Sequence, residues 1–376
     1  MPGYELINRK EQNAVNKLFN EGGVLFAHGF EKLRKKYHVR EFEKNFSKYL
    51  DAYKCLAVSS GTAAIKIGLK ALGVKAGDEV ITQAFNFIAT VEAILDLGAK
   101  PVIINVNKTL NMDPLELEKM INKKTKAVIP VHMLGFSSEM KEIINICKRK
   151  KVKILEDNCE SLGGKYQGKY LGTLGQVGAL SFDHGKILTT GEGGIVISKN
   201  SKLDKYSREY HDHGHENNSK YSRGEDTKNI YGFNYRMTEL QGVIGKVQLK
   251  KLKYILKKNK ERYNQLDKVL KNKFEIRKKP KNSIPNHDTF IFFLNNKKQK
   301  KTILKAIKKN NFGTKNLPDA IKWHCSFFWH HALPLMQIKK SRKTKELLST
   351  AIAVPININR SIKDYQKLAK SIFSVS

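Results

Sequence analysis

The sequence predicts an α/β protein with a large domain on a mostly parallel sheet and a smaller C-terminal α+β domain. From residue 55 to about 200, short apolar runs alternate with amphipathic segments, the pattern of a parallel sheet covered on both faces. The chain has 376 residues, 40% of them hydrophobic, which is enough for one large and one smaller core. We expect the large domain, with its N-terminal segment, at 1–255 and the small domain at 256–376.

The elements of the large domain follow one another in order. Expected strands lie at 55–60, 78–85, 101–107, 126–133 and 152–157, with helices between them at 61–74, 86–98 and 138–150. The runs "QVGALSFDHGK" and "GGIVISKN" predict two hairpin-like strands around a glycine turn. Residues 207–232 are polar and irregular, which is typical of a functional segment, and the run starting at Thr238 has helical spacing toward the small domain.

The formal net charge of +35 first suggests nucleic acid or an anionic membrane. The basic residues are nevertheless mostly lysines scattered from Lys10 to Lys370, and no DNA-reading motif accompanies them. We therefore expect no nucleic-acid or membrane partner. The charge is interpreted as a lysine bias with little functional meaning, and attraction of acidic substrates is the lesser alternative. The four cysteines lack metal-ligand spacing, so we expect no metal and a reduced compartment. With no apolar leader or spanning run, the expected location is the cytoplasm.

One lysine stands apart from the others. In "SFDHGKILTTGEGG", Lys186 follows a predicted strand and precedes glycines that let the backbone approach a bulky group closely. A lysine amine does covalent chemistry when it attacks a carbonyl held beside it. The alternative is an ordinary surface lysine, and the neighbouring motifs favour the covalent role.

Two motifs would surround a planar, phosphorylated ligand. In "VSSGTAAIKIGL" a strand is expected to end at Ser59 and Ser60, Gly61 to make the turn, and a helix to begin at Thr62. Free amides at a helix start bind phosphate. A simple serine cap is the alternative. Phe85 and Phe87 alternate at another strand end, so one can face the core while the other stacks on a ring.

A third motif supplies an acid. In "KILEDNCESLGG" an apolar strand delivers Glu156 and Asp157 at its carboxyl end, where open α/β sheets bind ligands. A carboxylate there can pair with a protonated ring nitrogen, and Mg²⁺ binding or capping are the alternatives. Phosphate donors, an aromatic face, an acid and a lysine together predict pyridoxal 5'-phosphate (PLP, with its amino form PMP).

The chain resembles the DegT/DnrJ/EryC1/StrS sugar aminotransferases, of PLP fold type I, over nearly its whole length. The motifs "SSGTAA", "SFDHGKILTTGEGG" and "GFNYRMTELQGVIG" occur in the family's order. The resemblance implies that Lys186 is the Schiff-base lysine and Asp157 the partner of the pyridine nitrogen. It implies further cofactor contacts at Ser60, Gly61, Thr62, Phe87, Glu160, Ser181 and Asn234. Because Asn234 would reach the partner subunit's site, the resemblance also implies a homodimer with shared active sites.

Two positions refine the expected reaction. Many family members have Gln where this chain has Glu160, and a carboxylate beside the ring's 3'-oxygen would repel it unless one of them is protonated. Some relatives replace the lysine with His and dehydrate sugars, so the presence of Lys186 favours transamination.

A finer resemblance concerns "MPGYEL", "HDHGH" and "IYGFNYRM". It is to family members that aminate 8-dehydro-3-deoxy-manno-octulosonate with L-glutamate, giving 8-amino-3,8-dideoxy-manno-octulosonate for lipopolysaccharide. His213 and His215 would then contact the sugar. The alternatives are a nucleotide-linked 3- or 4-keto sugar and, more remotely, a non-catalytic PLP-binding or nucleic-acid-binding regulator.

Three further residues and one pair have open roles. Trp323, His324 and Trp329 either line a pocket or pack in the small domain. Arg236 and Glu239, one helical step apart, are expected to form a structural pair.

Overall fold

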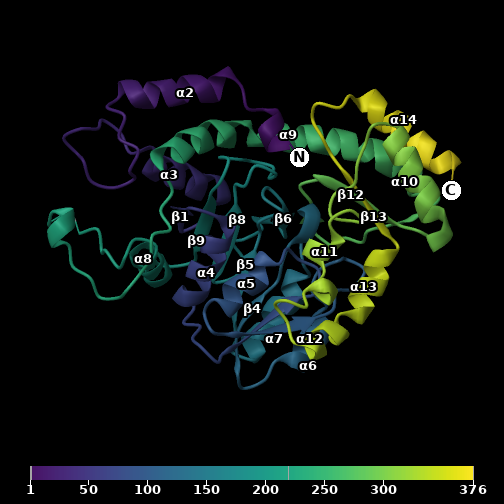
Figure 1. Cartoon of the computed structure of the whole chain (residues 1–376), viewed down its shortest axis with the longest axis horizontal. Coiled ribbons are helices and arrows are strands. Elements are labelled where there is room, and N and C mark those ends of the chain that lie inside the picture. Colours follow the sequence, from purple (N-terminus) through teal and green to yellow (C-terminus); the bar gives the residue numbers. More distant parts are fainter. Residues whose placement is uncertain (1, 219, 376) are drawn as a thin grey trace.

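The computed structural model describes residues 2–218 and 220–375, and in these residues a seven-stranded sheet forms the centre of the molecule (Figure 1). The strand order is β1-β9-β8-β5-β4-β2-β3. The strands are β1 (Lys54–Val58), β2 (Glu79–Gln83), β3 (Lys100–Ile104), β4 (Thr125–Ile129), β5 (Lys153–Asp157), β8 (Val177–Ser181) and β9 (Gly194–Ser198). Only β9 runs antiparallel to its neighbours, β1 and β8, while the other paired strands are parallel. The mostly parallel sheet and the hairpin-like strands at β8 and β9 are confirmed.

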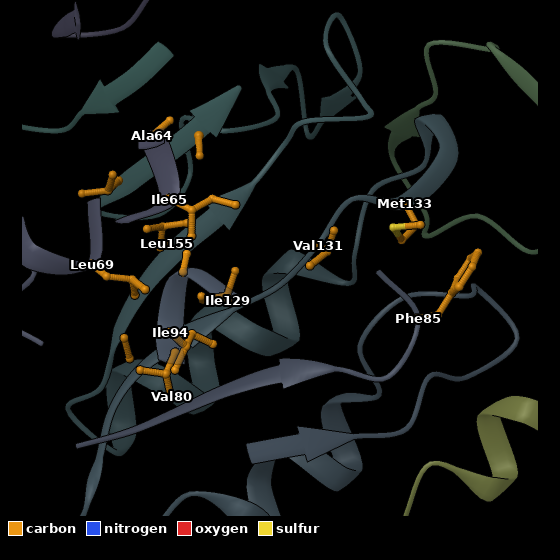
Figure 2. Close-up of a cluster of buried hydrophobic side chains, with 14 of the residues drawn as sticks. Ala64, Ile65, Leu69, Val80, Phe85, Ile94, Ile129, Val131, Met133 and Leu155 are labelled. Carbon is orange, nitrogen blue, oxygen red and sulfur yellow. The ribbon is translucent and has the colours of Figure 1, made fainter. Parts of the chain in front are cut away.

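The helices between these strands cover the sheet through apolar side chains. They are α4 (Gly61–Ala71), α5 (Ala89–Leu95), α6 (Pro114–Met120) and α7 (Met140–Arg149), and α8 (Ser201–Tyr210) follows the last strand, β9. Figure 2 shows part of this core, where Ile65 of α4 and Leu155 of β5 are buried together. Gly68 allows the close approach, since a Cβ there would lie 2.6 Å from Leu155 Cδ1.

A long helix joins the two ends of the molecule. α9 (Glu239–Leu270) has 32 residues and begins with a capping box between Thr238 and Gln241. α2 (Arg9–Asn20) and α3 (His38–Leu50) pack on α9, and α14 (Ile362–Ser374) packs on it near the C-terminal domain (Figure 1). The expected domain boundary at 255 falls inside α9, which therefore contributes to both parts.

The C-terminal part is a smaller α+β unit. Its antiparallel sheet has the order β10-β12-β13 and packs against two helices. These elements are β10 (Glu275–Ile276), β12 (Thr289–Phe293), β13 (Ala351–Pro355), α10 (Lys300–Lys309) and α14. The phenylalanines and isoleucines of β12 and β13 are buried on both faces, which explains why these strands read as continuous apolar runs.

Shorter elements complete the chain. They are α1 (Pro2–Glu5), η1 (Met133–Gly135), β6 (Lys165–Tyr166), β7 (Lys169–Tyr170), η2 (Arg223–Glu225), β11 (Ser283–Ile284), η3 (Lys297–Gln299), α11 (Ile321–His324), η4 (Ser326–Phe328), α12 (Leu335–Lys340) and α13 (Arg342–Ser349). The predicted irregular segment 207–232 is wrong for its first residues, because α8 continues to Tyr210. Beyond α8, the chain around η2 stands away from the sheet at the left of Figure 1. None of the helices described is both long and apolar enough to cross a membrane.

Candidate active site

A cavity of about 360 Å³ lies where the carboxyl ends of β5 and β8 meet the start of α4. Eight of the eleven residues that the sequence predicted for the site line it: Ser60, Gly61, Thr62, Phe87, Asp157, Glu160, Ser181 and Lys186. The location agrees with the rule that open α/β sheets bind ligands outside the carboxyl ends of their strands.

Lys186 lies in the loop between β8 and β9, and its side chain is 22% exposed. Its Nζ is 3.8 Å from Glu160 Oε1. Burial lowers the pKa of the Lys186 amine, but the carboxylate of Glu160 and other acids nearby outweigh burial and raise that pKa above its ordinary value. The amine is therefore protonated at neutral pH, and it must give up a proton before it can attack a carbonyl.

Glu160 is ionised in this arrangement. Burial raises the pKa of its carboxyl, but the charges of Lys186, Lys315 and His324 and a backbone hydrogen bond lower it to about 2. The hydrogen bond comes from the Leu134 N–H, 3.1 Å from Glu160 Oε2. Glu160 is thus an anion paired with Lys186.

The two adjacent acids of β5, Glu156 and Asp157, point in different directions. Asp157 lines the cavity, and its Oδ2 accepts a hydrogen bond of 2.7 Å from the Thr90 hydroxyl. Glu156 is fully buried and accepts backbone hydrogen bonds from the loop 172–175 and one from His132. Because side chains alternate along a strand, only Asp157 is available to a ligand, and Glu156 anchors the loop instead.

The start of α4 forms a small polar cradle. Ser60 caps the helix by accepting a hydrogen bond of 3.1 Å from the Ala63 N–H. A Cβ on Gly61 would lie 2.8 Å from Ser181 Cβ and 3.1 Å from Cys159 Sγ, so only glycine fits there. The first amides of an 11-residue helix next to two hydroxyl side chains suit a phosphate group.

Phe85 and Phe87 separate as expected from their alternation. Phe85 is fully buried, while Phe87 lines the cavity and is 44% exposed. The small domain holds this segment, because the Asn86 N–H donates to the His324 carbonyl at 3.1 Å. The His324 ring also lies beside Phe87, with ring centroids 5.4 Å apart.

Several cavity residues escaped the sequence prediction. Thr90 bonds Asp157, and Lys315 reaches the cavity while its Nζ pairs with Asp288 Oδ2 at 2.7 Å. His324, whose role the sequence left open, lines the cavity, whereas Trp329 is fully buried in a cluster that includes Ile88 and Val91 of the large domain. Thr90 lies three residues after Phe87, about one helical turn. That spacing was the one feature of the sequence that could have placed Thr90 at the cavity.

Three predicted site residues lie outside the cavity formed by this chain. Asn234 and His213 are exposed in the segment that follows α8. The His215 ring lies 3.3 Å from Asp226 Oδ2, within the same segment. The structure of one chain therefore does not bring these three side chains to Lys186.

The expected pair of Arg236 with Glu239 is wrong. Arg236 Nη1 is 2.7 Å from Asp212 Oδ1, and Glu239 instead pairs with Arg34 at 3.0 Å. The reason is that α9 begins only at Glu239, so the two residues are not on one helix.

The residues present fit PLP. Lys186 offers an amine, Asp157 a buried carboxylate for a ring nitrogen, and the cradle at Gly61 room for a phosphate. Within the described residues, no group of three or more histidines, cysteines or acids is placed to hold a metal ion.

Comparison with known proteins shows similarity to sugar-modifying enzymes over part of the chain. A GDP-perosamine synthase of Caulobacter vibrioides is 37% identical over 215 residues, which is 57% of each chain. A 3-oxo-glucose-6-phosphate:glutamate aminotransferase of Bacillus subtilis is 36% identical over 244 residues, or 64% of this chain and 53% of that one. The chain thus matches little more than half the length of these relatives.

The fold extends further than these sequence matches. The aminotransferase of Psychrobacter cryohalolentis superposes with a TM-score of 0.84 at 23% identity, covering 98% of this chain and 97% of that one. Residues 24–372 match one family description over nearly the whole chain. The chain belongs to the DegT/DnrJ/EryC1/StrS aminotransferase family.

Proposed function

We propose that this protein is a sugar aminotransferase, which moves the amino group of L-glutamate to the carbonyl carbon of a sugar. PLP is the cofactor of the family. The observation that carries the proposal is the convergence of Lys186, Asp157 and the start of α4 on one cavity. A lysine amine and an acid held beside a phosphate cradle are the parts that this chemistry requires.

Each residue has a role in holding the cofactor. Gly61, Thr62 and Ser181, with the amides of α4, bind the phosphate, and Ser60 fixes the helix start. Asp157 keeps the ring nitrogen protonated, and Thr90 orients the Asp157 carboxylate. Phe87 covers one face of the ring. When bound, PLP supplies the electron sink that lets a carbon–hydrogen bond beside the amine break.

Lys186 moves the proton in both half-reactions. Its Nζ takes the proton from Cα of glutamate and, in the reverse sense, returns one to the carbon of the aminated sugar. Glu160 stabilises the protonated form of this amine, since the two side chains are 3.8 Å apart. The same ion pair neutralises the Glu160 charge, which would otherwise repel an oxyanion on the ring.

The acceptor we propose is an anionic sugar with a free ketone or aldehyde. Two relatives are named for GDP-perosamine and for 3-oxo-glucose 6-phosphate, and both compounds carry phosphate groups. The octulosonate aldehyde suggested by the sequence carries a carboxylate. A chain with a formal charge of +35 attracts all three, and the nucleotide-linked keto sugars have the additional support of the relatives' names.

We further propose a homodimer with shared sites. Asn234 does not line its own chain's cavity, although its neighbours pair with the end of β1, where the Ser59 N–H donates to the Tyr235 carbonyl at 2.8 Å. Exposed aromatic side chains accompany it, with Tyr231 69% and Phe233 44% exposed. Large exposed aromatic groups in one place are typical of an interface.

The test is to load the purified protein with PLP, reduce it with borohydride, and locate the adduct by mass spectrometry. We expect the adduct on Lys186, none on a Lys186→Ala variant, and no change in a Lys199→Ala variant, which removes a surface lysine of the same region. L-Glutamate should change the visible spectrum, and a panel of keto and aldehyde sugars should then identify the acceptor by amination. An adduct that persists in Lys186→Ala, or a spectrum unmoved by glutamate, would contradict the proposal and favour a non-catalytic binder.

A further inference from the structure

Arg277, which follows β10 in the small domain, is buried close to the candidate active site, with 3% of its surface exposed. Its guanidinium donates to the Thr109 carbonyl at 2.6 Å, the Met133 carbonyl at 2.9 Å and Asn111 Oδ1 at 3.2 Å. Within the described chain, none of these acceptors is a carboxylate. The Arg277 Cζ also lies 4.4 Å from the centroid of the Phe136 ring. Burial of a cation without a paired carboxylate is costly, which raises the question of what else these contacts do.

One peptide unit connects Arg277 to the cavity. The carbonyl of Met133 accepts from Arg277, and the N–H of the same peptide, that of Leu134, donates to Glu160 Oε2 at 3.1 Å. In a trans peptide the C=O and N–H point in opposite directions. The guanidinium and the carboxylate therefore face the two ends of one peptide dipole, and each strengthens the hydrogen bond of the other.

The backbone at this peptide is held in an unfavourable conformation. Leu134 has φ 50°, in the left-handed region, which is unfavourable for a residue that carries a Cβ. Asn111 Oδ1 accepts a hydrogen bond of 3.1 Å from the Met133 N–H, and Arg277 donates both to Asn111 Oδ1 and to the Met133 carbonyl. Asn111 and Arg277 thus both hydrogen-bond to Met133 at this turn. Without Arg277 the turn can relax, and the Leu134 N–H then turns away from Glu160.

We propose that Arg277 is a positioning residue which, acting through the Met133–Leu134 peptide, holds Glu160 against Lys186. The inference rests on the proposed function, in which Lys186 carries the reaction. Through this contact the small domain sets the charge state of the amine in the large domain. Arg277 touches neither cofactor nor substrate in this scheme.

Two physical effects of Arg277 predict opposite results. A guanidinium acting only as a distant positive charge would repel a proton on Lys186 Nζ, so its removal would raise the pKa of the PLP group attached there. A guanidinium that holds Glu160 in place favours that proton, so its removal would lower the same pKa. The direction of the change therefore distinguishes the two.

The experiment is a pH titration of the visible absorbance of PLP bound through Lys186, in the full chain. We expect Glu160→Gln, Arg277→Lys and Arg277→Met each to lower the pKa of the PLP group attached to Lys186. For Glu160→Gln the decrease should be roughly one pH unit, a tenfold change in proton affinity. A lysine ammonium keeps the positive charge but cannot donate to all three acceptors of the guanidinium at once. Arg277→Lys should therefore lower the pKa less than Arg277→Met. In a Glu160→Gln background, neither Arg277 change should lower the pKa further.

Arg262 provides a matched control. It is buried in the same part of the molecule, 8% exposed, and its guanidinium also donates only to carbonyls, those of Ile358, Lys258 and Arg360. Arg262→Lys should lower the unfolding midpoint without moving the titration.

The outcomes separate this inference from the function on which it rests. The inference alone would be overturned if Arg277→Lys left the pKa of the PLP group attached to Lys186 unchanged or raised it. It would also be overturned if the Arg277 changes lowered the pKa as much in the Glu160→Gln background as in the wild-type protein. If Arg277→Met does not fold, Arg277→Lys and the double variant decide the matter. A wild-type protein that gains no visible absorbance with PLP would overturn the proposed function and this inference with it.

Discussion

Two neighbouring carboxylates show how strongly the role of a residue depends on which way its side chain points. Glu156 accepts hydrogen bonds from the backbone of Gly172, Leu174 and Gly175 at 2.6 to 3.0 Å. His132 adds a fourth at 2.9 Å, and because its Nδ1 accepts from a backbone N–H, its Nε2 carries the proton. Every acceptor site of Glu156 is thus occupied by the protein, whereas Asp157 faces the cavity.

Conservative changes at these two positions should therefore have opposite consequences. Asp157→Asn should lower the rate of the glutamate half-reaction by at least about 100-fold, because a neutral amide cannot keep the ring nitrogen protonated. Glu156→Gln should lower the free energy of unfolding by about 2–3 kcal/mol, because its NH₂ would face N–H donors. Stopped-flow absorbance and urea unfolding measure the two effects. A Glu156→Gln protein as stable as wild type, or an Asp157→Asn protein of normal rate, would contradict this assignment.

At the level of elements, α4 combines a structural and a functional contact within one helix. Its first residue, Gly61, lies against Ser181 at the cavity, and Gly68, two turns later, lies against Leu155 and Val177 in the core. Both glycines permit close approach, but only the first borders the phosphate cradle. The helix start that we propose to bind the phosphate thus belongs to the same helix that covers the sheet.

Alanine at each glycine separates these two contacts. Alanine favours a helix by about 1 kcal/mol over glycine, so any loss arises from the added Cβ. Gly61→Ala should weaken PLP binding at least about tenfold, because the cradle is displaced from Ser181, with a smaller effect on stability. Gly68→Ala should reduce the unfolding midpoint while PLP affinity stays near that of wild type. Equal PLP affinity for Gly61→Ala and wild type would show that the cradle is elsewhere.

The sequence predicted those parts of the site that lie at the ends of regular elements. Asp157, Ser181 and Gly61 sit where an apolar strand stops or a helix starts, and both events leave a pattern in the sequence. Arg277 and Lys315 follow short or irregular segments, and they approach the cavity only through the packing of the small domain. No local periodicity encodes that packing, so these residues could be found only in the folded chain.

At the scale of the whole molecule, the cavity around Lys186 includes residues from outside the large domain. The small domain reaches the cavity through His324 and Lys315, and α9 fixes its place by packing on α3 and α14. Asn234 is exposed beside the end of β1 and does not line the same cavity. A site that is complete only with a partner subunit would explain both the exposure of Tyr231 and Phe233 and the absence of Asn234 from the lining of its own chain's cavity.

Mixing inactive variants tests this sharing of sites directly. Lys186→Ala removes the amine, and Asn234→Asp places a carboxylate against the phosphate, which repels it. If Asn234 serves the partner's cavity, a dimer with one of each subunit has one fully intact site. Equal mixing, with subunit exchange, should then restore roughly a quarter of wild-type activity, because half of the dimers are mixed and each has one working site.

The matched control pairs Lys186→Ala with Asp157→Asn. These two residues line the cavity of a single chain, so every site in a mixed dimer keeps one defect and activity should stay at the level of the separate variants. Activity that returns in this control would mean that Lys186 and Asp157 come from different subunits. If instead the pair of Lys186→Ala and Asn234→Asp stays inactive although mass spectrometry shows mixed dimers, Asn234 acts within its own chain, and the proposed sharing of sites is wrong.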